Sequence, residues 1–163
     1  MQHDGYELVH FNFAMARRPL DHPDMNGFTS QLDAVNRLAL ASPGFVWSPA
    51  DGEAGDAVAT FGSPLVLANM STWRSLEDLR RFTYEGQHGR ALKKRREWFD
   101  APSGPSYVLW WIPAGHRPNW EEAKRRLDHL ATHGPTPHAF TFFTVFNPEA
   151  TEVSLADGSP VRK

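Results

Sequence analysis

The stretch Pro64–Phe99, PLVLANMSTWRSLEDLRRFTYEGQHGRALKKRREWF, decides the fold. Residues 65–73 are apolar at almost every position, which predicts a buried strand. Ser75 follows this strand, and its hydroxyl can accept a backbone N–H of a first helical turn. Asp78 favours the same helix end through the helix dipole. The stretch therefore predicts a strand that runs directly into a long helix.

The predicted helix carries an apolar stripe with a histidine on it. The stripe follows steps of mainly three and four residues, through Leu76, Leu79, Phe82, Tyr84, His88, Leu92, Arg95 and Phe99. His88 is thus a titratable group among apolar neighbours, flanked by Gly86 and Gly89. Each glycine costs about 1 kcal/mol relative to alanine in a helix, so a kink beside a ligand is one interpretation. Close packing against a neighbouring helix is the other.

Composition limits the class of protein. The chain has 163 residues, a formal net charge of −2 and no cysteine, which argues against polyanion binding, disulfides and thiolate metal sites. The N-terminal residues lack an apolar run, and nothing approaches the ~20 apolar residues of a membrane span. We expect one cytoplasmic domain over residues 1–147 with a polar tail over 148–163, without nucleic-acid or membrane partners.

The order of elements predicts an α+β fold. Strands are expected at residues 6–15, 44–48, 65–73, 106–115 and 138–146, with helices at 25–42, after Ser75 and within 116–134. The first six elements read β-α-β-β-α-β, the ferredoxin-like arrangement of an antiparallel sheet with helices on one face. The last helix and strand are additions to it.

The aromatic content suggests a second protomer. The chain has six Trp, eleven Phe and three Tyr, and the strands at 65–73 and 106–113 are apolar on both faces. One layer of helices covers only one face of a sheet. We therefore expect a homodimer in which two sheets meet as a dimeric α/β barrel.

Six segments of the sequence resemble a bacterial family of uncharacterised domains within the dimeric α/β-barrel superfamily. The resemblance covers nearly the whole chain. The segments are Tyr6–Ala14 (YELVHFNFA), Ser42–Trp47 (SPGFVW), Asn69–Leu79 (NMSTWRSLEDL), Arg95–Phe99 (RREWF), Val108–Pro118 (VLWWIPAGHRP) and His133–Phe142 (HGPTPHAFTF).

Two more distant groups of this superfamily imply different activities. Antibiotic-biosynthesis monooxygenases oxidise polyketides without metal or flavin, whereas haem-degrading monooxygenases hold haem with an Asn, a Trp and a ligating His. Asn12 matches the Asn, but Phe82 stands where the Trp would be. His88 lies about one turn before the expected His, where Leu92 stands. The resemblance thus implies a cofactor-free enzyme or, alternatively, a haem protein with His88 as axial ligand.

Several residues are candidates for a site, each with a plain structural alternative. His10 and Asn12 share one strand face and suit proton transfer and substrate orientation, or simply a solvated face. His116-Arg117-Pro118 could bind an anion at the mouth of a barrel, or be an inert loop. His129, His133 and His138 have no carboxylate at metal-site spacing, so we expect no metal site there. The predicted substrate-binding residues are Trp47, Trp73, Phe82, Tyr84, Leu92, Trp110 and Arg117.

Three functions follow from these candidates. The first is an enzyme that oxidises or cyclises an aromatic or polyketide-like small molecule, with His88, Asn12 and His10 as catalytic residues and no cofactor. Its pocket should lie between the sheet and the two main helices, lined by Asn12, Trp73, Phe82, His88 and Trp110. The second is the haem protein. The third is a non-catalytic ligand-binding or stress-associated module, in which the aromatic rings serve packing only. The expected partner is a small aromatic or apolar molecule.

Overall fold

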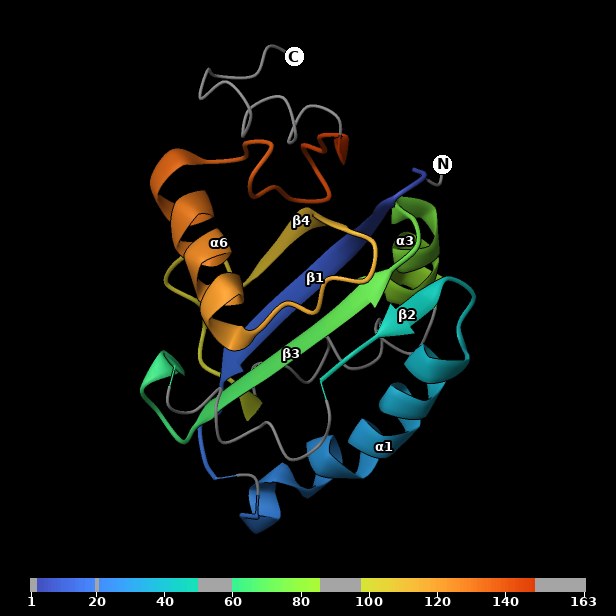
Figure 1. The fold of residues 1–163 in the computed structure, drawn as a ribbon. Coiled ribbons are helices and arrows are strands. Elements are labelled where there is room, and N and C mark those ends of the chain that lie inside the picture. The colour runs from blue at the N-terminus through green and yellow to red at the C-terminus, as the bar shows by residue number, and fades with distance from the viewer. Residues whose placement is uncertain (1–2, 20, 50–59, 86–97, 149–163) are drawn as a thin grey trace.

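Four antiparallel strands form one sheet in the computed structural model, which describes residues 3–19, 21–49, 60–85 and 98–148. The strands are β1 (Tyr6–Met15), β2 (Phe45–Trp47), β3 (Val66–Trp73) and β4 (Tyr107–Pro113), in the spatial order β2-β3-β1-β4. The long strands β1 and β3 lie side by side at the centre (Figure 1). This order is that of a split βαβ unit, so the predicted ferredoxin-like α+β fold is confirmed.

In the described part of the chain, the α-helices that follow β1, β3 and β4 pack on this sheet. The 3-10 turn η1 (Pro23–Met25) leads into α1 (Asn26–Ala41), which connects β1 to β2. The helix α3 (Leu76–Glu85) follows β3, and α6 (Trp120–His133) follows β4. Figure 1 shows α6 crossing the sheet on one side, away from α1 and α3. Of the described helices, none is long and apolar enough to cross a membrane.

The two sides of the sheet carry separate apolar clusters. We name them the Leu8 face, which bears Leu8 and His10 of β1, and the Val9 face, which bears Val9 and Phe11. The Leu8 face packs against α3 and against aromatic side chains of the segment after α6. The Val9 face packs against the buried side of α6, formed by Trp120, Ala123, Leu127 and Leu130. Each long strand is therefore apolar on both faces because both faces are covered.

This arrangement removes the premise of the predicted dimer. We inferred a partner sheet because one layer of helices would leave the other face bare. In the structure α6 supplies that second layer from the same chain. The homodimer and the limits of the domain stay predictions, and the dimer no longer has this support.

The segment predicted as a last strand is not a strand in the described structure. Only Phe140 pairs with the sheet, through two 2.9 Å backbone hydrogen bonds with Leu109 of β4. Beyond it, the Thr141 hydroxyl accepts the backbone N–H groups of Phe143 and Thr144 at 3.2 and 3.3 Å. A side chain that takes these donors turns the chain and keeps them out of a strand ladder.

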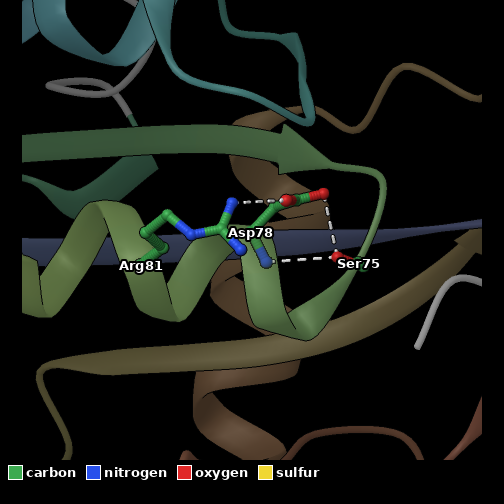
Figure 2. Close-up of polar contacts among 3 residues, drawn as sticks. All are labelled: Ser75, Asp78 and Arg81. Carbon is green, nitrogen blue, oxygen red and sulfur yellow. Dashed lines mark hydrogen bonds and ion pairs between the residues drawn. The ribbon is translucent and has the colours of Figure 1, made fainter.

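The predicted start of α3 is confirmed at the atomic level. The Ser75 hydroxyl accepts the backbone N–H of Asp78 at 3.1 Å and donates to its carboxylate at 2.9 Å (Figure 2). Arg81 binds the other carboxylate oxygen at 3.3 Å. The predicted continuation of this helix, with Gly86, His88, Gly89 and Leu92, lies outside the described residues.

Candidate functional site

A pocket of about 500 Å³ opens where the end of β4 meets α6 and the turn after α6. Its walls combine apolar side chains of β4 with basic and acidic side chains of the helix. Such a mixture of apolar wall and converging polar groups is typical of small-molecule sites. The lining residues are Trp111, Ile112, Pro113, His116, Glu122, Arg125, Arg126, His129 and His138.

Glu122 is the anchored carboxylate of this pocket. Asn119 caps α6 by accepting the backbone N–H of Glu122 at 2.8 Å, which fixes the residue in the first helical turn. The indole N–H of Trp110 donates to Oε2 at 2.9 Å, and Nε2 of His116 lies 2.8 Å from Oε1. The side chain is only 12% exposed. Both oxygens therefore have a fixed partner, and the carboxylate orients the His116 ring.

Arg126 lies one turn further along the same side of α6. Its Nη1 donates to the backbone oxygen of His138 at 2.8 Å, and its guanidinium carbon lies 5.9 Å from the centre of the Trp110 ring. Burial lowers the pKa of Arg126 from its ordinary value, against the opposing effect of the Glu122 carboxylate. A guanidinium stays protonated at neutral pH in such a setting. Arg126 is therefore a partly buried cation in the pocket wall.

Three histidines gather at the far end of α6. The ring of His129 lies 4.5 Å from that of His133 and 5.6 Å from that of His138, and its Nε2 is 2.9 Å from the Thr136 hydroxyl. Burial, followed by the neighbouring basic groups, lowers the pKa of His129 and of His138. Both rings are therefore neutral at pH 7. Within the described ranges, no group of three or more His, Cys, Asp or Glu side chains could hold a metal ion.

His10 and Asn12, predicted as catalytic residues, both lie on the Leu8 face of β1. His10 is 8% exposed, and its ring centre lies 6.0 Å from those of Tyr107 and Phe142. Asn12 is half-buried and lies opposite Tyr107 and Asn69 in the sheet. The third predicted catalytic residue, His88, lies outside the described residues, so the three are not assembled here.

Three of the predicted substrate-binding residues also lie on the Leu8 side. Trp73 is fully buried, stacks on Phe82 at 5.1 Å between ring centres and donates its indole N–H to Ser71 at 2.8 Å. Tyr84 is 65% exposed and meets the ring of Phe142 edge-on. Trp73 and Phe82 thus form part of the core, and Leu92 falls outside the described residues.

The other predicted binding residues lie on the opposite side of the sheet. Trp110 is opposite Val9 in the register, and Trp47 packs against the same Val9-face cluster. The guanidinium carbon of Arg117 lies 5.3 Å from the Trp47 ring. The prediction that Trp110 and Trp73 line one pocket is therefore wrong, because alternate strand positions face opposite sides of the sheet.

The sequence contained a signal for the α6 pocket that our interpretation missed. Glu122, Arg126, His129 and His133 follow at steps of four, three and four residues, which places them on one side of a helix. The anion site suggested for His116 and Arg117 is divided by the structure. His116 belongs to the pocket through Glu122, whereas Arg117 stacks on Trp47.

Among solved structures, two that are distantly similar to this chain are proteins of Nitrosomonas europaea. A crystal structure of NE2512, a protein of unknown function, is 9% identical over 72% of this chain and 97% of that chain, with a TM-score of 0.45. A structure titled "Putative antibiotic biosynthesis monooxygenase" is 8% identical over 73% of this chain and 100% of that one, with a TM-score of 0.48. No statement about activity follows from likenesses at this level.

The sequence itself identifies the family. No curated protein matches the chain. The domain of unknown function DUF3291 matches residues 7–156, which is nearly the whole length. The predicted resemblance to an uncharacterised domain family is therefore confirmed, and the chain belongs to the DUF3291 family.

Proposed function

We propose that the protein is a small-molecule enzyme that works by acid/base catalysis in the pocket between β4 and α6. One observation carries the proposal: the His116 ring lies 2.8 Å from an anchored carboxylate at the wall of a pocket of about 500 Å³. An imidazole held by a carboxylate is a common acid/base group, because the carboxylate fixes the ring and stabilises its protonated form.

The chemistry uses His116 as the group that moves the proton. His116 takes a proton from an acidic C–H or O–H of the bound molecule, which leaves a substrate anion and an imidazolium. Glu122 offsets the charge of that imidazolium, and the proton returns to the product in a later step. The His116 side chain is 44% exposed, so a molecule in the pocket can reach it. No cofactor is needed for this transfer.

The apolar wall suggests what kind of molecule fits. Ile112 and Pro113 of β4 line one side of the pocket, and the apolar face of a flat ring suits such a wall. An aromatic or polyketide-like substrate, as expected from the sequence, agrees with this wall. Oxidation or cyclisation of such a compound can begin with the proton transfer described above, and oxidation would then take dioxygen as the second substrate.

Deuterium exchange tests the proposal. A panel of aromatic ketones with an acidic C–H beside the carbonyl is incubated with the protein in deuterated water, and incorporation of deuterium at that carbon is followed by NMR. We expect catalysed exchange that falls at least about 100-fold in His116→Gln, because a general base contributes about that much. His133→Gln is the matched control, since this exposed residue of α6 does not line the pocket. Equal exchange by both variants would contradict the proposal.

A second candidate keeps the chemistry on the Leu8 face. His10 is buried among the rings of Tyr107 and Phe142, where an aromatic ligand would be in contact with an imidazole. Exchange that is lost in His10→Gln and kept in His116→Gln would favour this candidate. The haem alternative depends on His88, which the structure does not describe, and a visible spectrum of the purified protein tests it directly.

A further inference from the structure

We propose that the ligand of the α6 pocket carries a carboxylate, and that Arg126 binds it. This inference rests on the proposed function, because it names the substrate class of the same pocket. It starts from a mismatch of charge: the pocket wall contains Arg125 and Arg126 but one carboxylate, Glu122. A partly buried cation without a carboxylate at ion-pair distance is unfavourable, and a bound anion relieves that cost.

Arg126 has no carboxylate partner within the described part of the chain. The described ion pairs within 4.0 Å do not include this residue, although its neighbour Lys124 is paired with Asp128 at 2.7 Å. Its one described hydrogen bond, from Nη1 to the backbone oxygen of His138, uses one of five N–H donors. The remaining donors suit a bidentate contact with two oxygens of one anion.

Glu122 does not serve as that partner, although it lies one helical turn away. Its Oε1 is 2.8 Å from His116, and its Oε2 accepts the indole N–H of Trp110 at 2.9 Å. The two carboxylate oxygens are held by groups from β4 and from the loop after it. On the same pocket wall, α6 thus carries Glu122, whose two oxygens already have hydrogen-bond partners, and Arg126, which has further N–H donors available for a ligand.

The other groups at this end of the pocket also favour an anion. His129 and His138 line the pocket, and their rings are polar without a negative charge. His129 contacts the Thr136 hydroxyl at 2.9 Å. On the opposite side the wall is apolar, formed by Ile112 and Pro113 of β4. A carboxylate at Arg126 and an apolar group against these residues satisfy both walls at once, which defines a carboxylic acid with an apolar body.

A pair of matched probes tests the charge requirement. The protein is titrated with 2-naphthoate and with 2-naphthamide, which share shape and differ in charge, while the indole N–H resonances are followed by NMR. We expect naphthoate to shift the indole resonance of Trp110, which contacts Glu122 and Arg126, and to bind about 10-fold more tightly than the amide, as a charge-assisted contact provides. Trp73, on the Leu8 face, should not shift.

Variants of α6 then locate the contact. Arg126→Gln should remove the preference for the acid and leave the amide affinity within about twofold, because only the charged contact is lost. Lys124→Gln is the matched control, since Lys124 is a neighbouring cation paired with Asp128. If Arg126→Gln does not fold, Arg126→Lys replaces it. This variant keeps the positive charge and removes the paired N–H donors of the guanidinium, so the preference for the acid over the amide should be reduced rather than lost.

Each other outcome has a definite meaning. Equal binding of acid and amide, read from the Trp110 resonance, would overturn the carboxylate inference and leave the proposed function standing. Shifts with inorganic phosphate but not with naphthoate would also overturn it, in favour of a phosphate site. If neither probe shifts the Trp110 resonance, the inference fails, and the deuterium-exchange panel then decides on the proposed function separately.

Discussion

Ser71 and Thr72 are neighbours on β3 whose hydroxyl groups have opposite surroundings. Ser71 faces the Leu8 side, where its oxygen accepts the indole N–H of buried Trp73 at 2.8 Å. Thr72 faces the Val9 side and is fully buried, and its hydroxyl has no hydrogen-bond partner among the described residues. A buried polar group without a partner destabilises a fold, whereas a paired one does not.

This difference predicts opposite effects of two small substitutions. Ser71→Ala should lower the free energy of unfolding by about 1–3 kcal/mol, because the Trp73 N–H loses its acceptor inside the core. Thr72→Val keeps the shape and removes the unpaired hydroxyl, so it should be neutral or stabilising by up to about 1 kcal/mol. Urea unfolding followed by tryptophan fluorescence measures both. Equal destabilisation by the two would contradict this account.

Local patterns predicted some single residues, and only the fold reveals the others. The cap at Ser75 could be read from the sequence, because a capping residue and its partner lie three positions apart in the chain. The contacts of Glu122 with Trp110 and His116 span twelve and six positions. They depend on how α6 lies on β4, which no local pattern specifies. For this reason the sequence pattern grouped Trp110 with Trp73 in one pocket, although Trp110 lies on the Val9 face and Trp73 on the Leu8 face.

At the scale of elements, Gly44 determines how closely β2 approaches the start of α3. Its φ angle is +83°, and a Cβ atom there would run into the side chain of Asp78. Its backbone oxygen accepts the N–H of Arg74 at 2.8 Å, which ties the entry of β2 to the end of β3. Asp78 is also the residue that Ser75 and Arg81 hold in Figure 2. The glycine thus leaves room for the capped end of α3.

Substitution at Gly44 should separate steric conflict from backbone strain. Gly44→Ala should cost about 3 kcal/mol or more, because it combines left-handed strain with a clash at Asp78. Gly62→Ala is the control, because Gly62 has a φ angle of +80° and no heavy atom within 4 Å of an added Cβ. It should cost about 1 kcal/mol from strain alone. Thermal unfolding of both variants gives the comparison, and similar melting temperatures would contradict it.

Helices and strands with a strong hydrophobic periodicity were predicted well. The segment in which a side-chain hydroxyl binds the backbone N–H groups that a strand would use was not. The helices α1 and α6 and the strands β1, β3 and β4 lie within or close to their expected ranges. Residues 138–146 alternate like a strand, but the Thr141 hydroxyl turns the chain after Phe140. Hydrophobic pattern alone does not show such a local hydrogen bond, and it did not show that α6 covers the Val9 face.

At the scale of the whole molecule, the histidine cluster links stability to pH. Burial lowers the pKa of His129 and His138 below the 6.5 of an unfolded chain. Between the lowered values and 6.5, the unfolded chain binds protons that the folded chain does not. The contribution of these two neutral histidines to the free energy of unfolding is therefore fully present above pH 6.5. It is lost as the pH falls below 6.5, because the unfolded chain then binds protons that the folded chain does not.

The melting temperature should accordingly fall between pH 7.5 and pH 5.5, a range in which exposed carboxylates barely titrate. The double variant His129→Gln, His138→Gln should show a smaller fall over the same range, whatever its absolute stability. His22→Gln is the control for loss of a histidine outside this cluster. A fall of equal size in wild type and double variant would show that other groups cause the pH dependence.

The pairing of Phe140 with Leu109 has a further consequence for how the sheet meets other chains. Exposed strand edges invite the addition of foreign strands and the growth of aggregates. Here the outer edge of β4 is blocked at its middle by the chain itself, and the opposite edge, β2, is only three residues long. Release of the segment around Phe140 would uncover β4 and withdraw His138 from the pocket wall. Protection against aggregation and integrity of the ligand site therefore depend on the same two backbone hydrogen bonds.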